Sequence, residues 1–159
     1  MLAPSIHPGK LSKTHWSATE AENVSLIADF VQRLMNDHDF DYVSERFSNS
    51  SYVQHNRNIP DGMPALIRFV SDFAQKYPEY SYDVKHVYAD GDFVIFHSQA
   101  TINAKDRGND HKGLNIIDTW RIKDGQIVEH WDALQPMDIP MRLFTLFNGG
   151  KVRNENGVY

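Results

Sequence analysis

The hydrophobic residues of this chain recur with one period in its first half and with another in its second half. Between residues 17 and 77 they return every three or four positions, which is the spacing of a helix that buries one face. The first predicted helix begins at Ser17, which forms a capping-box pattern with Glu20. A short helix over residues 40–47 follows, and a third ends where Pro78 interrupts the pattern. We therefore expect three helices before any long strand.

From Tyr80 onward the period becomes two, which is typical of β-strands. The stretch "FVIFHSQATI" (residues 93–102) is apolar at both alternating sets of positions, so we expect both of its faces to be covered. A polar loop over residues 103–113 precedes a predicted β-hairpin over residues 115–136, and the earlier "SSYVQHN" predicts a short strand. Helices followed by long antiparallel strands predict the α+β class, with the helices packed on one face of a curved sheet.

Three ionisable side chains interrupt the apolar strands of the hairpin "NIIDTWRIKDGQIVEHWDALQP": Asp118, His130 and Asp132. Aspartate is depleted in strands, and burial among apolar side chains disfavours its ionised form. A carboxylate in such a place is a candidate general base near neutral pH. Other polar groups also lie within apolar strands or beside them, namely His97 and the run Gln54, His55 and Asn56. Together with Trp120 they predict a pocket lined by aromatic side chains and a few convergent polar groups.

The register of the hairpin decides which of these side chains meet, because a one-residue slip moves every side chain to the other face. A two-residue turn at Asp124-Gly125 would place Asp118 opposite Trp131. A type I turn followed by Gly125 as a bulge residue would place Asp118 opposite His130 instead. We favour the bulged register because it gathers the costly polar groups on one face. That face would hold Ile116, Asp118, Trp120, Val128, His130 and Asp132. The other face would hold Ile117, Thr119, Arg121, Ile127, Glu129 and Trp131.

Composition limits the classes of function. A chain of 159 residues favours one domain with a short appendage. The net charge of −5 and the absence of a basic run argue against a nucleic-acid partner. The chain has no cysteine, no apolar signal-like start and no apolar run long enough to cross a membrane, so we expect a cytoplasmic protein without a membrane partner.

Metal and cofactor chemistry receive little support from the sequence. His55, His97, His130 and Asp118 have side chains suited to zinc or iron, but no local ligand spacing connects them. The chain has neither a glycine-rich phosphate loop nor a nucleophile elbow. We therefore expect no metal and no cofactor.

The segments "YVQHN", "VIFHSQ" and "IDTWRIKDGQIVEHWDALQP" resemble the SnoaL-like polyketide cyclases of the nuclear transport factor 2-like superfamily, to which ketosteroid isomerase, limonene epoxide hydrolase and scytalone dehydratase also belong. The resemblance covers about residues 18–137. It implies a cone-shaped α+β half-barrel, in which a curved mixed or antiparallel sheet wraps around N-terminal helices and encloses a deep pocket. It also implies a homodimer formed through the outer face of the sheet. An arm over residues 1–16 and an extension over residues 138–159 would flank this domain of residues 17–137.

The same resemblance assigns roles to residues. It carries a catalytic acid or base onto Asp118 and a histidine partner onto His97. The substrate, a small hydrophobic carbonyl compound, would contact a set composed of Gln54, His55, Asn56, Trp120, His130 and Asp132. Asp118 would remove a proton next to the carbonyl, and aldol cyclisation, isomerisation or dehydration would follow. Two alternatives stay open: epoxide hydrolysis by a water that Asp132 or Asp118 activates and Asn56 holds, and a non-catalytic module for ligand binding or dimerisation.

Overall fold

Five α-helices and five strands make up the part of the chain that the computed structural model describes, which is residues 2–48 and 51–159. Met1 of the predicted arm and Ser50 of the predicted short strand lie outside the described residues. The α-helices are α1 (Pro8–Leu11), α2 (Ala18–Val31), α3 (Phe40–Phe47), α4 (Met63–Lys76) and α5 (Ile139–Asn148). A π-helical turn, η1 (Gln32–Asp37), extends α2, and a short 3₁₀ turn, η2 (Ala104–Asp106), lies in the polar loop.

The helix starts that the sequence predicts are confirmed. Ser17 and Glu20 form the capping box at the start of α2: the Glu20 backbone N–H donates to the Ser17 hydroxyl at 3.2 Å, and the Ser17 backbone N–H donates to the Glu20 carboxylate at 2.7 Å. The same carboxylate accepts a hydrogen bond from the backbone N–H of Gly91, in the turn between two strands. The cap therefore fixes the end of α2 to the sheet that the helix covers.

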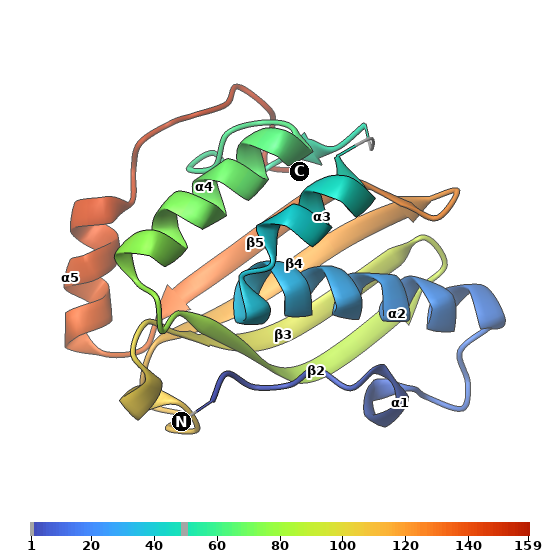
Figure 1. Ribbon diagram of the computed structural model, residues 1–159, viewed down its shortest axis with the longest axis horizontal. Coiled ribbons are helices and arrows are strands. Elements are labelled where there is room, and N and C mark those ends of the chain that lie inside the picture. Colours follow the sequence, from blue (N-terminus) through green and yellow to red (C-terminus); the bar gives the residue numbers. More distant parts are fainter. Residues whose placement is uncertain (1, 49–50) are drawn as a thin grey trace.

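The sheet contains β1 (Val53–Gln54), β2 (Ser81–Asp90), β3 (Phe93–Thr101), β4 (Leu114–Lys123) and β5 (Gln126–Pro136), in the order β1-β5-β4-β3-β2. Neighbouring strands are antiparallel except β1, which runs parallel to β5 at one edge. The sheet is curved, and α2, α3 and α4 lie across one of its faces (Figure 1). The predicted α+β class, with the helices on one face of a curved mixed sheet, is confirmed.

The hydrophobic core fills the space between these helices and the inner face of the sheet. Its fully buried residues include Phe30 and Leu34 from the α2–η1 segment, Met63 from α4 and Phe96 from β3. Trp120 on β4 packs edge-on against Phe96, with ring centroids 5.3 Å apart. Along the described residues, every helix is too short or too polar to span a membrane.

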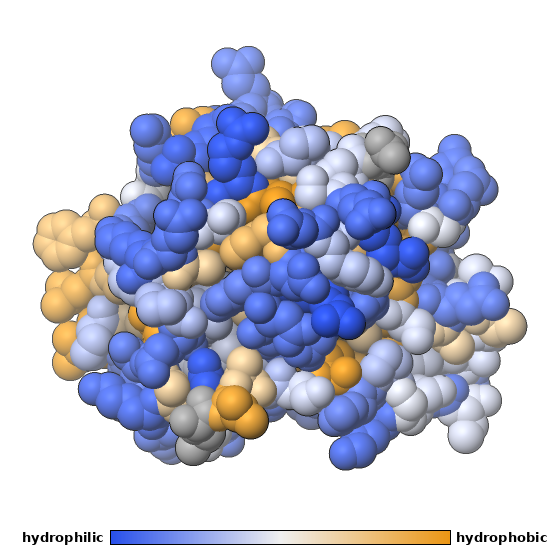
Figure 2. Space-filling model, viewed as in Figure 1, coloured by the Kyte–Doolittle hydropathy of each residue, from blue (hydrophilic) through white to orange (hydrophobic). Residues whose placement is uncertain are grey.

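The C-terminal residues follow the edge of the molecule. Helix α5 packs through Met141, which is buried, and through Phe144, whose ring lies 5.5 Å from that of Tyr77. Its other face leaves Leu146 and Phe147 mostly exposed, and Figure 2 shows this apolar surface at the end of the molecule that α5 occupies. Beyond α5 the chain passes along the side of the molecule on which α4 lies (Figure 1), and Asn156 reaches the backbone carbonyl of Gln54 on β1.

Candidate active site

The β4–β5 hairpin combines features of both predicted registers. Asp124 and Gly125 both have positive φ, 51° and 71°, and form the two-residue turn that pairs Lys123 with Gln126. The register then shifts between Arg121 and Ile122, because β5 contains one extra residue, Val128, that has no partner on β4. A bulge in this position re-aims every side chain that follows it.

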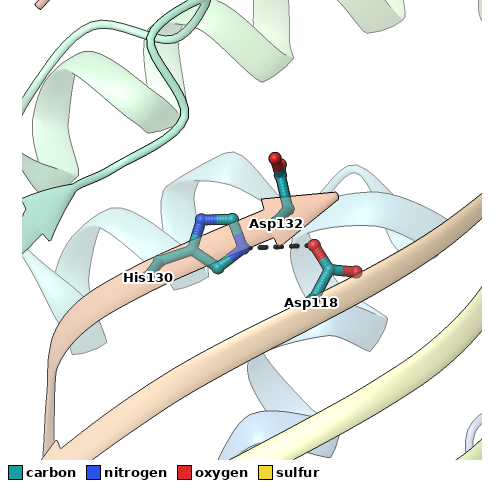
Figure 3. Close-up of side chains that lie close together, drawn as sticks. All are labelled: Asp118, His130 and Asp132. Carbon is teal, nitrogen blue, oxygen red and sulfur yellow. Dashed lines mark hydrogen bonds and ion pairs between the residues drawn. The ribbon is translucent and has the colours of Figure 1, made fainter. Parts of the chain in front are cut away.

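The favoured register is therefore wrong about which residues pair across the hairpin. It is right about most of the residues that share the inner face. Asp118 lies opposite Asp132 rather than His130, and His130 lies opposite Trp120. Ile127, which the favoured register placed on the outer face, is fully buried on the inner side. Asp118, His130 and Asp132 nevertheless project from the same side of the sheet, and Figure 3 shows the three side chains together.

A chain of hydrogen bonds connects Asp118 to the short edge strand. His130 Nε2 lies 3.1 Å from Asp118 Oδ1, and His130 Nδ1 lies 3.0 Å from Gln54 Oε1. Gln54 in turn donates from Nε2 to the Tyr52 hydroxyl at 2.8 Å. All four side chains are at least nine-tenths buried, so this is an interior network without solvent to complete it.

The network fixes which nitrogen of His130 carries a hydrogen. The backbone N–H of Asn56 donates to Gln54 Oε1 at 2.9 Å, so this atom must be the carbonyl oxygen of the amide. His130 Nδ1 faces the same oxygen and therefore must donate to it. In a neutral imidazole, Nε2 would then carry a lone pair that points at a carboxylate oxygen. This contact is repulsive unless a proton lies between the two atoms. The pair of Asp118 and His130 therefore holds one shared proton, as carboxylate and imidazolium or as carboxylic acid and imidazole.

Burial is the main influence on the acidity of Asp118. It raises the pKa of this carboxyl above its ordinary value of 3.8, while the hydrogen bond and charge of His130 oppose the rise and the charge of Asp132 adds to it. The second carboxylate oxygen, Oδ2, is buried and has no hydrogen-bond partner among the described residues. A buried oxygen of this kind is costly to leave unsatisfied.

Asp132 is held by a different amide. Asn56 Nδ2 lies 2.7 Å from both oxygens of the Asp132 carboxylate. The backbone N–H of Asn58 donates to Asn56 Oδ1, which fixes the orientation of the Asn56 amide. The Asn56 amide nitrogen thus donates to Asp132. Asn56 would therefore influence a bound ligand by orienting the Asp132 carboxylate.

The structure brings most of the predicted site residues together but separates two of the histidines from them. His97 lies on the outer face of the sheet, where its Nε2 is 2.6 Å from Asn115 Oδ1; the residue of β3 that faces Asp118 is Phe96. The expected pairing of His97 with Asp118 is wrong, because neighbouring strand positions point to opposite faces. His55 also lies on the outer side, with its ring stacked on Trp131 at 4.6 Å. The remaining predicted residues, Gln54, Asn56, Trp120, His130 and Asp132, share the inner side with Asp118.

Tyr52 belongs to the hydrogen-bonded network of the site and was missed. Tyr52 lies two residues before Gln54 in the sequence, and it is hydrogen-bonded to the Gln54 side chain and nearly parallel to the ring of His130. Burial raises the pKa of the Tyr52 and Tyr82 phenols, and the charge of Asp118 raises both further. Both hydroxyls therefore stay protonated and able to donate. The period of two in "SYVQHN" was the signal that could have found Tyr52.

The four side chains that the sequence offered as possible metal ligands, namely His55, His97, His130 and Asp118, do not come together, since His55 and His97 lie on the outer face. Ligand atoms of Asp118, His130 and Asp132 do lie within 4.8 Å of one another. In this arrangement a single proton completes the contact between Asp118 and His130, and Asn56 satisfies both oxygens of Asp132. We therefore describe the cluster as one that holds a proton.

The curved sheet, the helices on its inner face and the buried polar cluster between them define the class: this is an α+β cone of the nuclear transport factor 2-like type. The sequence profile of the SnoaL-like domain matches residues 27–130, and the chain belongs to that family. No curated protein sequence matches the chain.

Solved structures support the same fold. A candidate SnoaL-like polyketide cyclase from Jannaschia sp. superimposes with a TM-score of 0.62 at 17% identity, covering 87% of this chain and 100% of that one. A candidate polyketide cyclase from Bacillus cereus gives a TM-score of 0.60 at 20% identity, over 77% of this chain and 81% of that one. AclR, a candidate hydroxylase from Streptomyces galilaeus, gives a TM-score of 0.60 at 19% identity, over 82% of this chain and 97% of that one. At these identities the likeness establishes the fold alone.

Proposed function

We propose that this protein is an enzyme that removes a proton from the carbon next to a carbonyl group in a small hydrophobic molecule, by acid/base chemistry that needs no cofactor. The observation that carries the proposal is the buried Oδ2 of Asp118, which has no hydrogen-bond partner among the residues that the structure describes, beside a histidine with which Asp118 shares one proton. A buried carboxyl whose pKa is raised is suited to act as a base near neutral pH. The names of the two candidate polyketide cyclases are consistent with such chemistry.

The reactive form has the shared proton on His130 and the charge on Asp118. Oδ2 of Asp118 accepts the proton of the substrate, so that the C–H bond breaks, an O–H bond forms and the electron pair moves into an enolate. The imidazolium of His130 and the neutral phenol of Tyr52 both belong to the hydrogen-bonded network around Asp118. They would stabilise the negative charge that develops on the enolate. Addition of the enolate carbon to a second carbonyl gives an aldol product, and return of the proton to another carbon gives an isomer.

Roles within the proposed site differ from those expected from the sequence. Trp120, His130 and Asp132 lie beside Asp118 and would contact the substrate. Gln54 and Asn56 would position His130 and Asp132 rather than contact the substrate, because their side chains are bound to those two residues. His130 takes the place of His97 as the histidine partner of the base.

A second candidate is hydrolysis of an epoxide by activated water. It rests on Asp132, which is partly exposed and is oriented by Asn56 through both carboxylate oxygens. In that reaction Asp132 would take a proton from water while the water oxygen attacks an epoxide carbon, and the proton shared by Asp118 and His130 would neutralise the departing alkoxide. Incorporation of ¹⁸O from labelled water into a diol, lost in Asp132→Asn, would identify this reaction.

The test of the first proposal is hydrogen–deuterium exchange in heavy water at the carbon next to the carbonyl, across a panel of small hydrophobic ketones. The wild type is compared with Asp118→Asn, which has nearly the same shape but cannot accept a proton at neutral pH. Asp124→Asn is the matched control, since it makes the same chemical change in the turn of the same hairpin. We expect exchange in the wild type and the control and a loss of at least 100-fold, on the order of ~10²–10⁴ for a general base, in Asp118→Asn. Equal exchange in all three proteins, or none with ketones shown to bind, would refute the enolate mechanism.

We also propose that two copies of the chain associate through the outer face of the sheet. This face carries Tyr88, Phe93 and Ile117, which are 56%, 39% and 37% exposed, together with the half-buried Trp131. Apolar side chains that are exposed on one face of a sheet favour an interface there. Light scattering after size exclusion should give twice the chain mass, and Ile117→Lys should give the monomer mass; a monomeric wild type would contradict the proposal.

A further inference from the structure

The last residues of the chain return to the strand that supports the candidate site. We call residues 153–157 the C-terminal strap. Asn154 donates from Nδ2 to the backbone carbonyls of Asn56 and Ile59, at 2.9 and 2.7 Å, and Asn156 donates from Nδ2 to the backbone carbonyl of Gln54 at 2.8 Å. Asn154 is only 8% exposed, although it lies in a polar tail six residues from the end of the α5 helix. These contacts join parts of the sequence that are about one hundred residues apart.

The strap supplies hydrogen-bond donors that the sheet cannot. Strand β1 contains two residues and lies at the edge, where only one side pairs, with β5. The carbonyl groups on its free side need other partners, since buried backbone groups are rarely left unpaired. The backbone N–H of Asn156 donates to Asn154 Oδ1 at 3.0 Å, which turns Nδ2 of Asn154 toward the carbonyls. The strap therefore binds the free side of β1, where a neighbouring strand would otherwise pair.

Two of the three residues whose carbonyls the strap binds, Gln54 and Asn56, also position the reactive groups. Gln54 accepts the hydrogen of His130 Nδ1 and so determines that Nε2 faces Asp118. Asn56 binds both oxygens of Asp132. Movement of the β1 backbone away from β5 would release both side chains together, because Asn56 lies only two residues beyond Gln54, the last residue of β1.

We propose that the C-terminal strap is part of the active site, and that Asn154 and Asn156 are positioning residues that hold Gln54 on His130 and Asn56 on Asp132. The strap lies beyond the residues that match the SnoaL-like profile, which end at 130. It acts on the site on which the proposed function rests, but it can be tested without a substrate. A strap that only stabilised the fold would leave the His130 ring in its present hydrogen-bonding state as long as the protein is folded.

The decisive variants are Asn154→Asp and Asn156→Asp in the full-length chain. Each keeps the shape of the side chain and replaces the Nδ2 donor by an acceptor that repels the carbonyl opposite. Asn148→Asp is the matched control, because Asn148 also donates from Nδ2 to a backbone carbonyl, that of Phe144, but on the exposed end of α5. Asn156→Gln keeps an amide donor and tests rescue.

The first measurement is the ¹⁵N resonance pair of the His130 ring, which reports the nitrogen that carries hydrogen. We expect the wild type, the control and Asn156→Gln to carry hydrogen on Nδ1 in every ring, whether or not Nε2 holds the shared proton, and the two aspartate variants to show rings that lack hydrogen on Nδ1. In the deuterium-exchange assay the aspartate variants should lose about 10–100-fold in kcat with little change in KM, since displacement by about 1 Å has effects of this size.

Unchanged His130 resonances in folded aspartate variants would overturn the proposal, even if their melting temperatures fell, because the strap would then be structural only. If an aspartate variant did not fold, Asn156→Ser would replace it: this change removes one donor without adding repulsion, and the same two resonances decide the outcome. The proposed reaction and the proposed role of the strap can be refuted independently of each other. A wild type that exchanges no ketone refutes the proposed reaction, and it leaves the result at His130 to decide the role of the strap.

Discussion

Replacing Asp118 by asparagine should make the protein more stable at neutral pH, although it alters a fully buried polar residue. The carboxylate has one partner, His130 Nε2, and its other oxygen has none among the described residues. Asparagine can direct its Nδ2 hydrogen to the lone pair that Gln54 fixes on His130 Nε2. The number of hydrogen bonds is then unchanged, while the charge is removed from the interior.

The expected gain follows from the cost of a buried charge. Because His130 becomes a neutral imidazole when Asp118 is replaced by asparagine, the change neutralises the whole pair and strands no charge. Replacing a whole buried ion pair by apolar residues of similar volume is neutral or favours folding by about 1–4 kcal/mol, whereas a stranded charge would cost about 3–5 kcal/mol. Asp118 is 3% exposed and lies opposite a second carboxylate, so we expect about 1–4 kcal/mol. For a chain of this size each kcal/mol moves the melting temperature by about 2–4 °C.

The pH dependence of the free energy of unfolding determines at which pH values Asp118→Asn should be more stable than the wild type. The pKa of Asp118 is raised above 3.8 on folding, so the folded state binds the proton more tightly than the unfolded state. The stabilisation from this group is therefore fully present below about pH 4 and is lost as the pH rises through the folded pKa. The wild type should lose stability over that interval relative to Asp118→Asn, and the two proteins should converge at acidic pH.

The assay is the free energy of unfolding in urea, measured for both proteins at pH values from 4 to 8, with Asp39→Asn, at the partly exposed cap of α3, as the control for the same chemical change. An Asp118→Asn protein less stable than the wild type at pH 7 would refute the reasoning. It would mean that the attraction between carboxylate and imidazolium exceeds the cost of burial, and that the pKa of Asp118 is lowered.

Three further predictions follow from the same contacts. Gln54→Leu leaves the hydrogens of His130 Nδ1 and the Asn56 backbone without an acceptor and should cost about 2–6 kcal/mol in urea unfolding, at about 1–3 kcal/mol for each donor; a cost below 1 kcal/mol would contradict the network. His97→Ala should retain deuterium exchange within about twofold, because His97 lies on the outer face, and a loss like that of Asp118→Asn would restore its predicted role. Tyr52→Phe removes the partner of Gln54 Nε2 and should cost about 1–3 kcal/mol, measured in the same way.

The secondary structure could be predicted from the sequence wherever one local rule governed it. The capping box at Ser17 and the short helix over residues 40–47 are present as expected, since hydrogen bonding within one turn and a local apolar stripe determine them. The α+β class followed from the order of the two periods. Helix α5 was not predicted, because its apolar run is short and much of that run is exposed in the structure.

The site could be predicted only in part, because it depends on contacts between distant residues. Asp118, His130 and Asp132 were found from the cost of placing charge in an apolar strand, which is a local property. The bulge at Val128 left no clear mark in the sequence, so the pairing was wrong. His97 was misplaced because β3 is apolar on both faces, and alternation then gives no sign of which residues point inward.

The choice of partners for the two carboxylates bears on what they are for. Within the described residues, Asp118 and Asp132 are bound by a histidine and an amide, and neither forms an ion pair with lysine or arginine. An arginine would hold a buried carboxylate in its ionised form and lower its pKa, which is the arrangement that a structural acid needs. An amide donates a hydrogen bond without a full charge, and a histidine can give the proton back. Burial raises the pKa of Asp118, and a histidine partner leaves this carboxyl able to take up and release a proton, which is the property that the proposed function needs and that the proposed strap would preserve.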